Sequence, residues 1–378
     1  MKIAGIPFVL LAAMACQSPD ETATPLPLAP SLDVQGAAAV GQVFTSSNQV
    51  AGNDVLVYHR DVNGTLSAAG SYSTGGTGTG SGLGNQGGVV LSSNGRFLLV
   101  VNAGSNDVAA FLIRPNGTLE RTGLIASGGT MPVSVTEHNG LVYVLNRGGD
   151  GNISGFTLSQ KGKLAALAGS TRPLTGNATD PAQIQFASKG RVLVVTEKAT
   201  NEIATYTVGA GGLATGPAAT PSSGQTPFGF GVFGGLVVVS EAFGGAPDAS
   251  ALSSYEVRAD GSLRLLSASV ATTETAACWV VITHDRRYAY TTNTGSNSIS
   301  GYSLHQGSLT LLDPSGVTAS TGGAPIDLAL SRNGAYLYAL TAAGHGIEGF
   351  SISADGSLTA LGSNIAGLPA GTNGLAAN

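Results

Sequence analysis

Charged residues, cysteines and helical patterns are all scarce in this sequence, and each scarcity excludes a class of protein. Only 10% of the 378 residues are Asp, Glu, Lys or Arg, and the formal net charge is −5. So few basic residues argue against a nucleic-acid partner, because phosphate backbones are bound by clusters of Lys and Arg. The two cysteines are too few for a disulfide framework. No segment after the N-terminal region shows the 3.6-residue periodicity of an amphipathic helix.

Glycine, by contrast, is abundant, with 56 residues, and it marks an internal repeat. A Gly-x-Leu turn follows an aromatic-ended strand seven times, with a period of about 49 residues. Asn-Gly and Asp-Gly are hairpin signals, because both central residues of a type I′ turn need positive φ. The repeated turns are at residues 63–66, 116–119, 161–164, 211–213, 260–263, 306–309 and 355–358. Short strands repeated at this period predict an all-β, seven-bladed β-propeller with four-stranded antiparallel blades.

The two ends of the propeller predict how the ring closes. The segment that begins at Gly41 matches the second strand of the other repeats, so the first blade lacks its innermost strand. Residues 374–377 match an innermost strand but have no blade of their own. We therefore predict that residues 373–378 complete the first blade, which removes the open sheet edges. On this scheme residues 41–378 form one domain.

The first fifteen residues are typical of an export signal. Lys2 supplies the positive start, residues 6–14 are apolar but too short to span a bilayer, and residues 13–15 form a small-x-small cleavage site. Cys16 follows at once, so the segment resembles a bacterial lipoprotein signal with Cys16 as the lipidated residue, although Ala13 replaces the usual Leu. Residues 16–40 are proline-rich and predict a flexible tether. We expect a periplasmic or cell-surface lipoprotein, with ordinary secretion as the alternative.

One end of the second strands supplies the main candidate site residues. With alternating strand directions, these strands end on the face that also carries the loops between blades, here called the mouth face. Their predicted last residues are Asn48, Asn102, Asn146, Glu197, Glu241, Asn293 and Ala342. Asparagine at a strand end also favours the turn that follows, which is an alternative explanation for the asparagines. Glutamate has no such role in turns, so Glu197 and Glu241 are the stronger candidates.

Other candidates lie on the same face. Arg147 and Arg172 could hold a carboxylate or phosphate, and Trp279 and His345 complete the predicted binding set, with core packing as the alternative for Trp279. Further charged residues predicted on this face are Asp180, Lys198, Asp248, Glu274 and Asp327. The other four histidines are predicted on the far face, which leaves no cluster with metal-ligand spacing. We therefore expect no metal and no cofactor.

The fourth repeat carries a resemblance to a known family. Residues 181–206, with Gly190-Arg191, a hydrophobic strand, Glu197 and a closing Tyr206, resemble the seven-bladed propeller lactonases, which include propeller-type 6-phosphogluconolactonases and carboxymuconate-lactonizing enzymes. The resemblance extends over residues 41–378 and implies a lactone hydrolase. In that family the blade reads Pro-Arg-His before its Glu, whereas this chain has Ala182 and Gln183. Histidines of an earlier blade are replaced by Gln86-Gly87-Gly88.

Two functional hypotheses follow from this comparison of residues. The first is hydrolysis of a small acidic sugar lactone, with Glu197 as general base at a partly solvated channel mouth. Loss of such a base typically lowers the rate by a factor of about 10² to 10⁴. The second is a non-catalytic exported binding or scaffold propeller, because the family's Arg and His are missing. The expected partner is a small-molecule ligand or an unidentified protein, membrane contact is expected only through the lipid anchor, and the chain is expected to be a monomer.

Overall fold

The computed structural model describes residues 40–362 and 364–378. The predicted export signal, the lipidated Cys16 and the tether up to residue 39 lie outside the described residues, so these predictions are not tested. The described residues form β-strands and two short 3₁₀ turns, η1 (Ser188–Gly190) and η2 (Phe243–Gly245). No helix within this part of the chain is long and apolar enough to cross a membrane.

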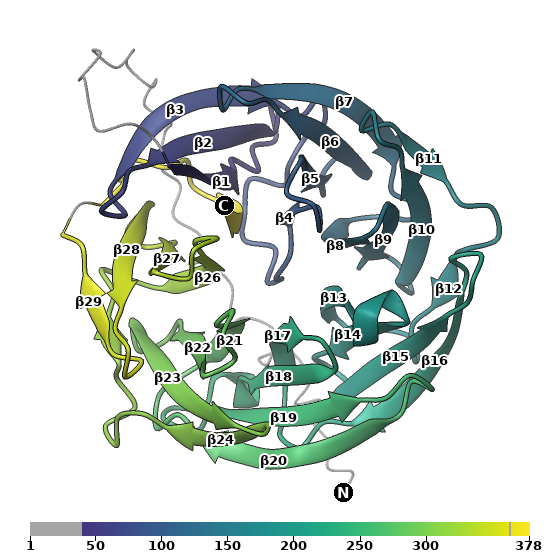
Figure 1. The fold of residues 1–378 in the computed structure, drawn as a ribbon. Coiled ribbons are helices and arrows are strands. Elements are labelled where there is room, and N and C mark those ends of the chain that lie inside the picture. Colours follow the sequence, from purple (N-terminus) through teal and green to yellow (C-terminus); the bar gives the residue numbers. More distant parts are fainter. Residues whose placement is uncertain (1–39, 363) are drawn as a thin grey trace, which may run out of the picture.

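Seven antiparallel sheets surround a common centre, as the blades of a propeller (Figure 1). The first blade contains β1 (Gly41–Ser46), β2 (Asp54–Arg60), β3 (Leu66–Ser73) and the last strand, β30 (Asn373–Ala377). The next three contain β4 (Val89–Leu91), β5 (Phe97–Asn102), β6 (Asp107–Ile113) and β7 (Leu119–Ala126); β8 (Pro132–His138), β9 (Leu141–Asn146), β10 (Asn152–Leu158), β11 (Leu164–Ala166) and β12 (Arg172–Pro173); and β13 (Pro181–Ala187), β14 (Val192–Glu197), β15 (Glu202–Val208) and β16 (Ala214–Pro221).

The remaining three blades follow the same plan. They contain β17 (Pro227–Phe233), β18 (Leu236–Glu241), β19 (Ala251–Val257) and β20 (Leu263–Ala271); β21 (Ala277–Ile282), β22 (Tyr288–Asn293), β23 (Ser298–His305), β24 (Ser308–Leu311) and β25 (Ala319–Ser320); and β26 (Pro325–Leu330), β27 (Tyr336–Thr341), β28 (Gly346–Ile352) and β29 (Leu358–Ala360). The short strands β12 and β25 pair with the third strands of their blades, β10 and β23. The predicted fold class is confirmed.

Burial along each blade explains the sequence pattern. The second strands β5 and β14 are buried at every residue, because both of their faces pack against neighbouring blades, and they are accordingly rich in Val and Leu. The outermost strand β3 exposes most of its residues. Between third and fourth strands the repeated turns have the predicted geometry: Gly64 has a φ of +85°, and the Asp61 carboxylate accepts hydrogen bonds from the amides of Asn63 and Thr65.

The ring closes as the sequence predicted. Strand β30 pairs antiparallel with β1 and supplies the innermost strand of the first blade. The Thr45 hydroxyl donates to the carbonyl of Gly374 at 2.6 Å, and the Leu375 amide donates to the Asp327 carboxylate at 2.9 Å. Asp327 lies in β26 of the last blade, so this hydrogen bond ties the closing strand to the neighbouring blade as well as to its own.

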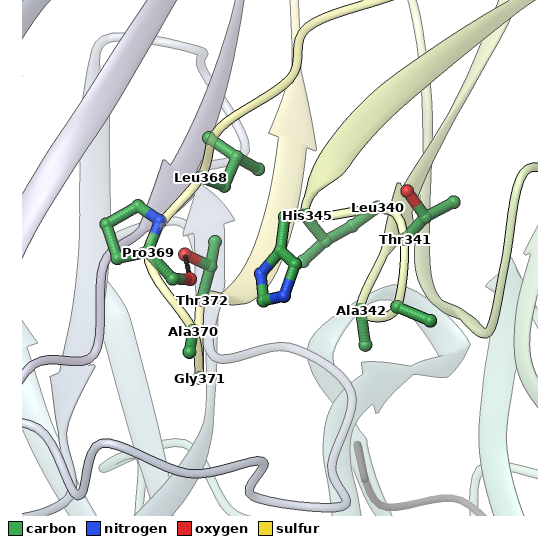
Figure 2. Close-up of a pocket in the computed structure, with 10 residues that line it drawn as sticks. Leu340, Thr341, Ala342, His345, Leu368, Pro369, Ala370, Gly371 and Thr372 are labelled. Atoms are coloured by element: carbon green, nitrogen blue, oxygen red, sulfur yellow. Dashed lines mark hydrogen bonds between the residues drawn. The ribbon is translucent and has the colours of Figure 1, made fainter. Parts of the chain in front are cut away.

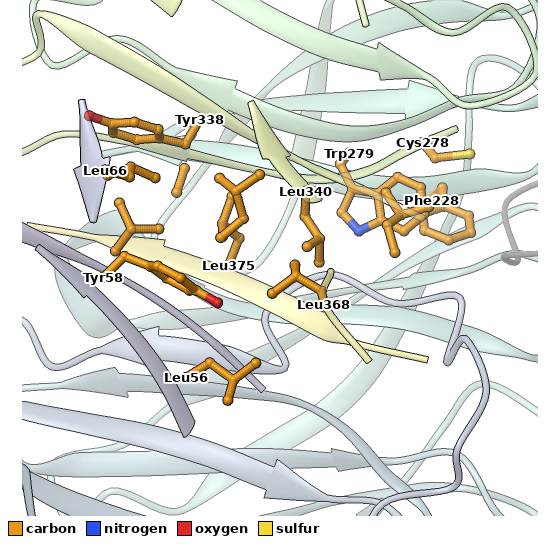
Figure 3. Packing of buried hydrophobic residues seen from close by; sticks show 14 of the residues in the cluster. Leu56, Tyr58, Leu66, Phe228, Cys278, Trp279, Tyr338, Leu340, Leu368 and Leu375 are labelled. Atoms are coloured by element: carbon orange, nitrogen blue, oxygen red, sulfur yellow. The ribbon is translucent and has the colours of Figure 1, made fainter. Parts of the chain in front are cut away.

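The apolar core is divided among the spaces between blades. One cluster joins residues of the last three blades to the first blade, and Figure 3 shows its packing at Trp279, Phe228, Leu340, Leu368 and Leu375. The rings of Phe228 and Trp279 lie 5.0 Å apart between centroids. Because this cluster contains residues from both ends of the propeller, closing the ring also completes the core.

Candidate functional site

The centre of the ring is occupied by a segment of the chain itself. Residues 74–88, the loop between β3 and β4, reach into the middle of the propeller (Figure 1). The Trp279 indole donates to the carbonyl of Asn85 at 2.6 Å. The Gln86 side chain donates to the carbonyl of Val280 at 2.9 Å and accepts from its amide at 3.1 Å. Gln86, where the family resemblance pointed to histidines, therefore helps to plug the channel.

Three charged side chains meet beneath this loop. The Arg147 guanidinium lies 2.6 Å from the Asp180 carboxylate, and the Lys198 ammonium lies 3.4 Å from its other oxygen. Arg147 also donates to the carbonyl of Leu83, and Lys198 to the carbonyl of Gly84, both at 2.8 Å. The two cations therefore converge on one carboxylate and on two consecutive carbonyls of the loop. This group, the Arg147–Asp180–Lys198 cluster, is the candidate site.

Burial gives Lys198 unusual acid–base properties. Its side chain is 4% exposed, and burial lowers its pKa to about 8, with Arg147 adding to the decrease and Asp180 opposing it. The ammonium also lies 4.7 Å from the centroid of the Phe228 ring, a cation–π distance. Functional sites often contain a lysine whose pKa has been lowered in this way beside a carboxylate.

The propeller symmetry explains why Arg147 and Lys198 meet. Each lies one residue beyond the end of a second strand, Arg147 after β9 and Lys198 after β14, in adjacent blades. Asp180 directly precedes β13 and holds a positive φ of +49°. The equivalent positions in the other five blades all hold uncharged residues: Asn48, Ala103, Ala242, Thr294 and Ala342. The two cations therefore stand out within a symmetric ring of positions.

A second feature of the mouth face is a cavity of about 130 Å³ beside His345 (Figure 2). It lies between the turn after β27 and residues 368–372, and Leu340, Leu368 and Pro369 give it an apolar wall. The imidazole of His345 projects toward Pro369, Ala370 and Thr372 in Figure 2. Within the described residues, no hydrogen bond or ion pair joins His345 to the Arg147–Asp180–Lys198 cluster.

Comparison with protein families shows to which family this chain belongs. The family described as lactonase, 7-bladed β-propeller, matches residues 51–172 and 249–372, which together make up more than half of the chain. The chain belongs to the seven-bladed propeller lactonases. No curated protein matches it in sequence.

Solved structures show the fold that this lactonase-family propeller shares. It is similar to a proposed 6-phosphogluconolactonase of Bacteroides uniformis, with 17% identity, a TM-score of 0.69 and coverage of 88% of this chain and 98% of the other. The periplasmic gluconolactonase PpgL of Pseudomonas aeruginosa has 14% identity, a TM-score of 0.68 and the same coverage. A protein from Lactobacillus plantarum has 16% identity and a TM-score of 0.70, with coverage of 90% and 100%.

The five strand-end residues predicted to contact ligand lie inside the blades of this lactonase-family propeller. Asn102, Asn146, Glu197, Glu241 and Asn293 all have no exposed surface. Asn102, Asn146 and Glu197 hydrogen-bond both to the loop that precedes their blade and to residues shortly after their own strand. Asn102, for example, accepts hydrogen bonds from Thr74 and Asn53 and donates to Asp107. The Asn293 amide instead donates to Ser298 and Ser300 within its own blade. By strand register, Ser47 and Thr341 hold the equivalent places in the first and last blades, so the alignment on Asn48 and Ala342 was wrong by one residue.

Glu197 does not lie at a solvated mouth, and that expectation is wrong. Its carboxylate accepts hydrogen bonds from the amide and hydroxyl of Thr175 and from the hydroxyl of Thr200. Burial raises its pKa above the ordinary value of 4.5, against the effect of these hydrogen bonds. Glu241 is held in the same way by the amide of Gly224 and the hydroxyl of Ser269, and burial raises its pKa too. Neither carboxylate has a basic partner within ion-pair distance in the described chain.

This placement predicts that Glu197→Gln changes stability rather than catalysis. A carboxyl whose pKa is raised on folding stabilises the protein below pH 4.5, and that contribution is lost as the pH rises. The variant cannot lose it, so its stability relative to wild type should increase from pH 4 to pH 7, as measured by urea unfolding. Glu120→Gln, at an exposed ion pair, controls for the change in net charge. A constant difference across this pH range would contradict the burial argument.

The other predicted residues have separate places. Arg172 lies in β12 at the outer side of its blade and donates to the carbonyls of Gly169 and Thr171, away from the cluster. Trp279 is 1% exposed and packs in the core, as its alternative explanation stated. Sequence reasoning placed Asp327 among the mouth-face charges, whereas it lines a channel cavity of about 190 Å³ with Gln86, Gln183 and Gln185. Burial raises the pKa of Asp327 well above its ordinary value.

Proposed function

We propose that this lactonase-family propeller hydrolyses a small acidic lactone at the Arg147–Asp180–Lys198 cluster. The observation that carries the proposal is the convergence of two cations on one carboxylate beneath the loop of residues 74–88, in a chain that belongs to the lactonase family. Hydrolysis of a lactone develops negative charge on the carbonyl oxygen, and fixed cations in a buried site stabilise that charge. A substrate carboxylate would bind the same cations.

The reaction needs a base as well as cations. In the proposed step Asp180 takes a proton from water while the water oxygen bonds to the lactone carbonyl carbon. The ring C–O bond then breaks, and Asp180 returns the proton to the leaving ring oxygen, which gives a hydroxy acid. Arg147 and Lys198 hold the oxyanion. This assignment replaces the earlier hypothesis of Glu197 as base, because a base must reach the attacking water and the Glu197 side chain is fully buried among Thr175 and Thr200.

A second candidate function is that of an exported binding propeller without catalysis. It is favoured by one observation: the acceptor positions beside Arg147 and Lys198 are filled by the carbonyls of Leu83 and Gly84. On this hypothesis the cluster is an anchor for the loop. The ligand, a small molecule or another protein, would then bind elsewhere on the mouth face, where the cavity beside His345 is available.

The test is a hydrolysis screen with purified protein from residue 40 onward. Acid release from glucono-δ-lactone, glucuronolactone and a phosphorylated aldonolactone is followed by pH-stat titration, with spontaneous hydrolysis subtracted. We expect turnover of the phosphorylated aldonolactone, the acidic member of this panel, and its loss in Asp180→Asn. Arg258→Met, an exposed cation outside the cluster, should keep full activity. A wild type that turns over no lactone in the panel would favour the binding propeller.

The cellular setting is part of the proposal. Export as a periplasmic or cell-surface lipoprotein anchored at Cys16, with the tether up to residue 40, would present a monomeric propeller to small molecules outside the cytoplasm. Support comes from the signal-like residues 1–15. Mass spectrometry of the membrane fraction should find a diacylated N-terminal cysteine, and a soluble, unmodified chain would indicate ordinary secretion.

A further inference from the structure

The loop over the cluster has two parts that are held very differently. Asn85 and Gln86 are fixed by hydrogen bonds to distant strands: to Trp279, Val280, Ala182 and Asn373. Residues 82–84 are not. Their only hydrogen bonds recorded within the described chain are the two that the carbonyls of Leu83 and Gly84 accept from Arg147 and Lys198.

The amide groups of residues 81–85 reinforce this contrast. None of them donates a hydrogen bond to another described residue, whereas the amides of Gly78, Thr79, Gly80 and Gln86 all do. The segment contains Gly82 and Gly84 and directly follows Gly80, and both Gly80 and Gly84 have positive φ. Local opening is easiest where backbone hydrogen bonds are few and glycine leaves the chain flexible.

We infer that residues 82–84, here called the strap, occupy the ligand position and withdraw to admit a small molecule with two neighbouring acceptor oxygens. The two carbonyls that Arg147 and Lys198 now hold stand in for a ring carbonyl and a carboxylate. The strap leaves while Asn85 and Gln86 keep the channel plugged, so ligand reaches the cluster from the mouth face. This inference rests on the proposed function for the identity of the ligand, but the opening of the strap can be measured without any ligand.

Leu83 supplies the main force that keeps the strap closed. Its side chain is 2% exposed, while the carbonyl contacts of the strap exchange readily for water once it lifts. Burial of a leucine side chain corresponds to a change in equilibrium of roughly 10-fold to 100-fold. Asn48 holds the preceding residues, donating to Thr79 at 3.3 Å and to the carbonyl of Ser81 at 2.8 Å. Leu83→Ala and Asn48→Gly should each favour the open strap, and glycine keeps the positive φ of position 48.

The experiment uses the chemical reactivity of Lys198 to measure how often the strap opens. Acetylation by N-hydroxysulfosuccinimide acetate at pH 8 is followed by peptide mass spectrometry, with exposed Lys161 as the internal standard. Lys198 in the closed state is covered by Gly84, so its acetylation measures opening. We expect slow labelling in wild type and roughly 10-fold to 100-fold faster labelling of Lys198, relative to Lys161, in Leu83→Ala. Asn48→Gly should accelerate it in the same direction, and Leu213→Ala, at a partly exposed leucine, should not.

Emission from Trp279, which is the only tryptophan in the sequence, checks that each variant is folded and still plugged. Equal Lys198 labelling in wild type and in both strap variants would contradict the inference that the strap opens. Lactone hydrolysis separates this result from the proposed function. Faster labelling with no hydrolysis by any variant would support the strap and reject the lactonase, whereas hydrolysis with unchanged labelling would support the lactonase and reject the strap.

Discussion

Deleting residues 373–378 should abolish the folded propeller or leave it close to unfolding at room temperature. The deletion removes strand β30, exposes the edge of β1, and leaves the Asp327 carboxylate without its Leu375 partner. Burial of Leu375 is worth about 2 kcal/mol, and each lost hydrogen bond about 1 kcal/mol. Together these losses approach the 5–15 kcal/mol that stabilise a typical domain.

Urea unfolding followed by Trp279 fluorescence measures the effect, and light scattering detects aggregation through the open edge. The matched control replaces the outermost strand β29, Leu358–Ala360, by Gly-Ser-Gly. Two of its three residues are exposed, so the change should be much smaller. If the truncated chain unfolds at the same urea concentration as the full chain, β30 does not hold the ring closed.

The sequence predicted the fold because the repeat constrains it redundantly. Seven Gly-x-Leu turns fix the number of blades, and the unmatched strands at residues 41 and 374 leave a single way to close the ring. The fully buried second strands β5 and β14 also carry a strong hydrophobic pattern. Errors in any one repeat are corrected by the other six.

The site was harder to predict, because a β-strand turns successive side chains to opposite faces. Sequence analysis centred the mouth on Glu197, whose side chain points into the space between blades, whereas Lys198, one residue later, points to the cluster. In the first and last repeats, the sequence alignment placed Asn48 and Ala342 with the strand-end residues, although they belong one residue later. This error of one residue mixed the buried strand-end positions with the positions that follow them, and so hid the difference between the two sets. Strand register, which the sequence of a single chain leaves uncertain at strand ends, was the missing information.

The plug could not be predicted for another reason. Trp279 and Asn85 are 194 residues apart in the chain, and their contact depends on how far a glycine-rich loop extends across the ring. Such a loop has no periodicity that specifies its path. The resemblance to the lactonases showed only that residues 86–88 stand where the family has histidines. That Gln86 helps to plug the channel follows only from the three-dimensional structure.

Lys198→Met should reduce lactone hydrolysis by roughly 10² to 10³, the usual effect of removing one positioned group that stabilises an oxyanion. Methionine keeps most of the length of the side chain while removing the charge and its cation–π contact with Phe228. Lys161→Met, at an exposed position, controls for the change in net charge. Melting temperatures measured alongside separate a loss of catalysis from a loss of fold.

Lys198→Arg gives the sharper test, because it changes the pH dependence rather than only the rate. The proposed role requires the ammonium form, and its pKa of about 8 means that this form is lost as the pH rises through 8. In wild type, kcat/KM should therefore fall above pH 8, after subtraction of spontaneous hydrolysis. An arginine stays protonated throughout this range, so the variant, even if slower, should show no such fall. A variant that retains the same alkaline decrease would mean that another group titrates, and that Lys198 is only an anchor for the strap.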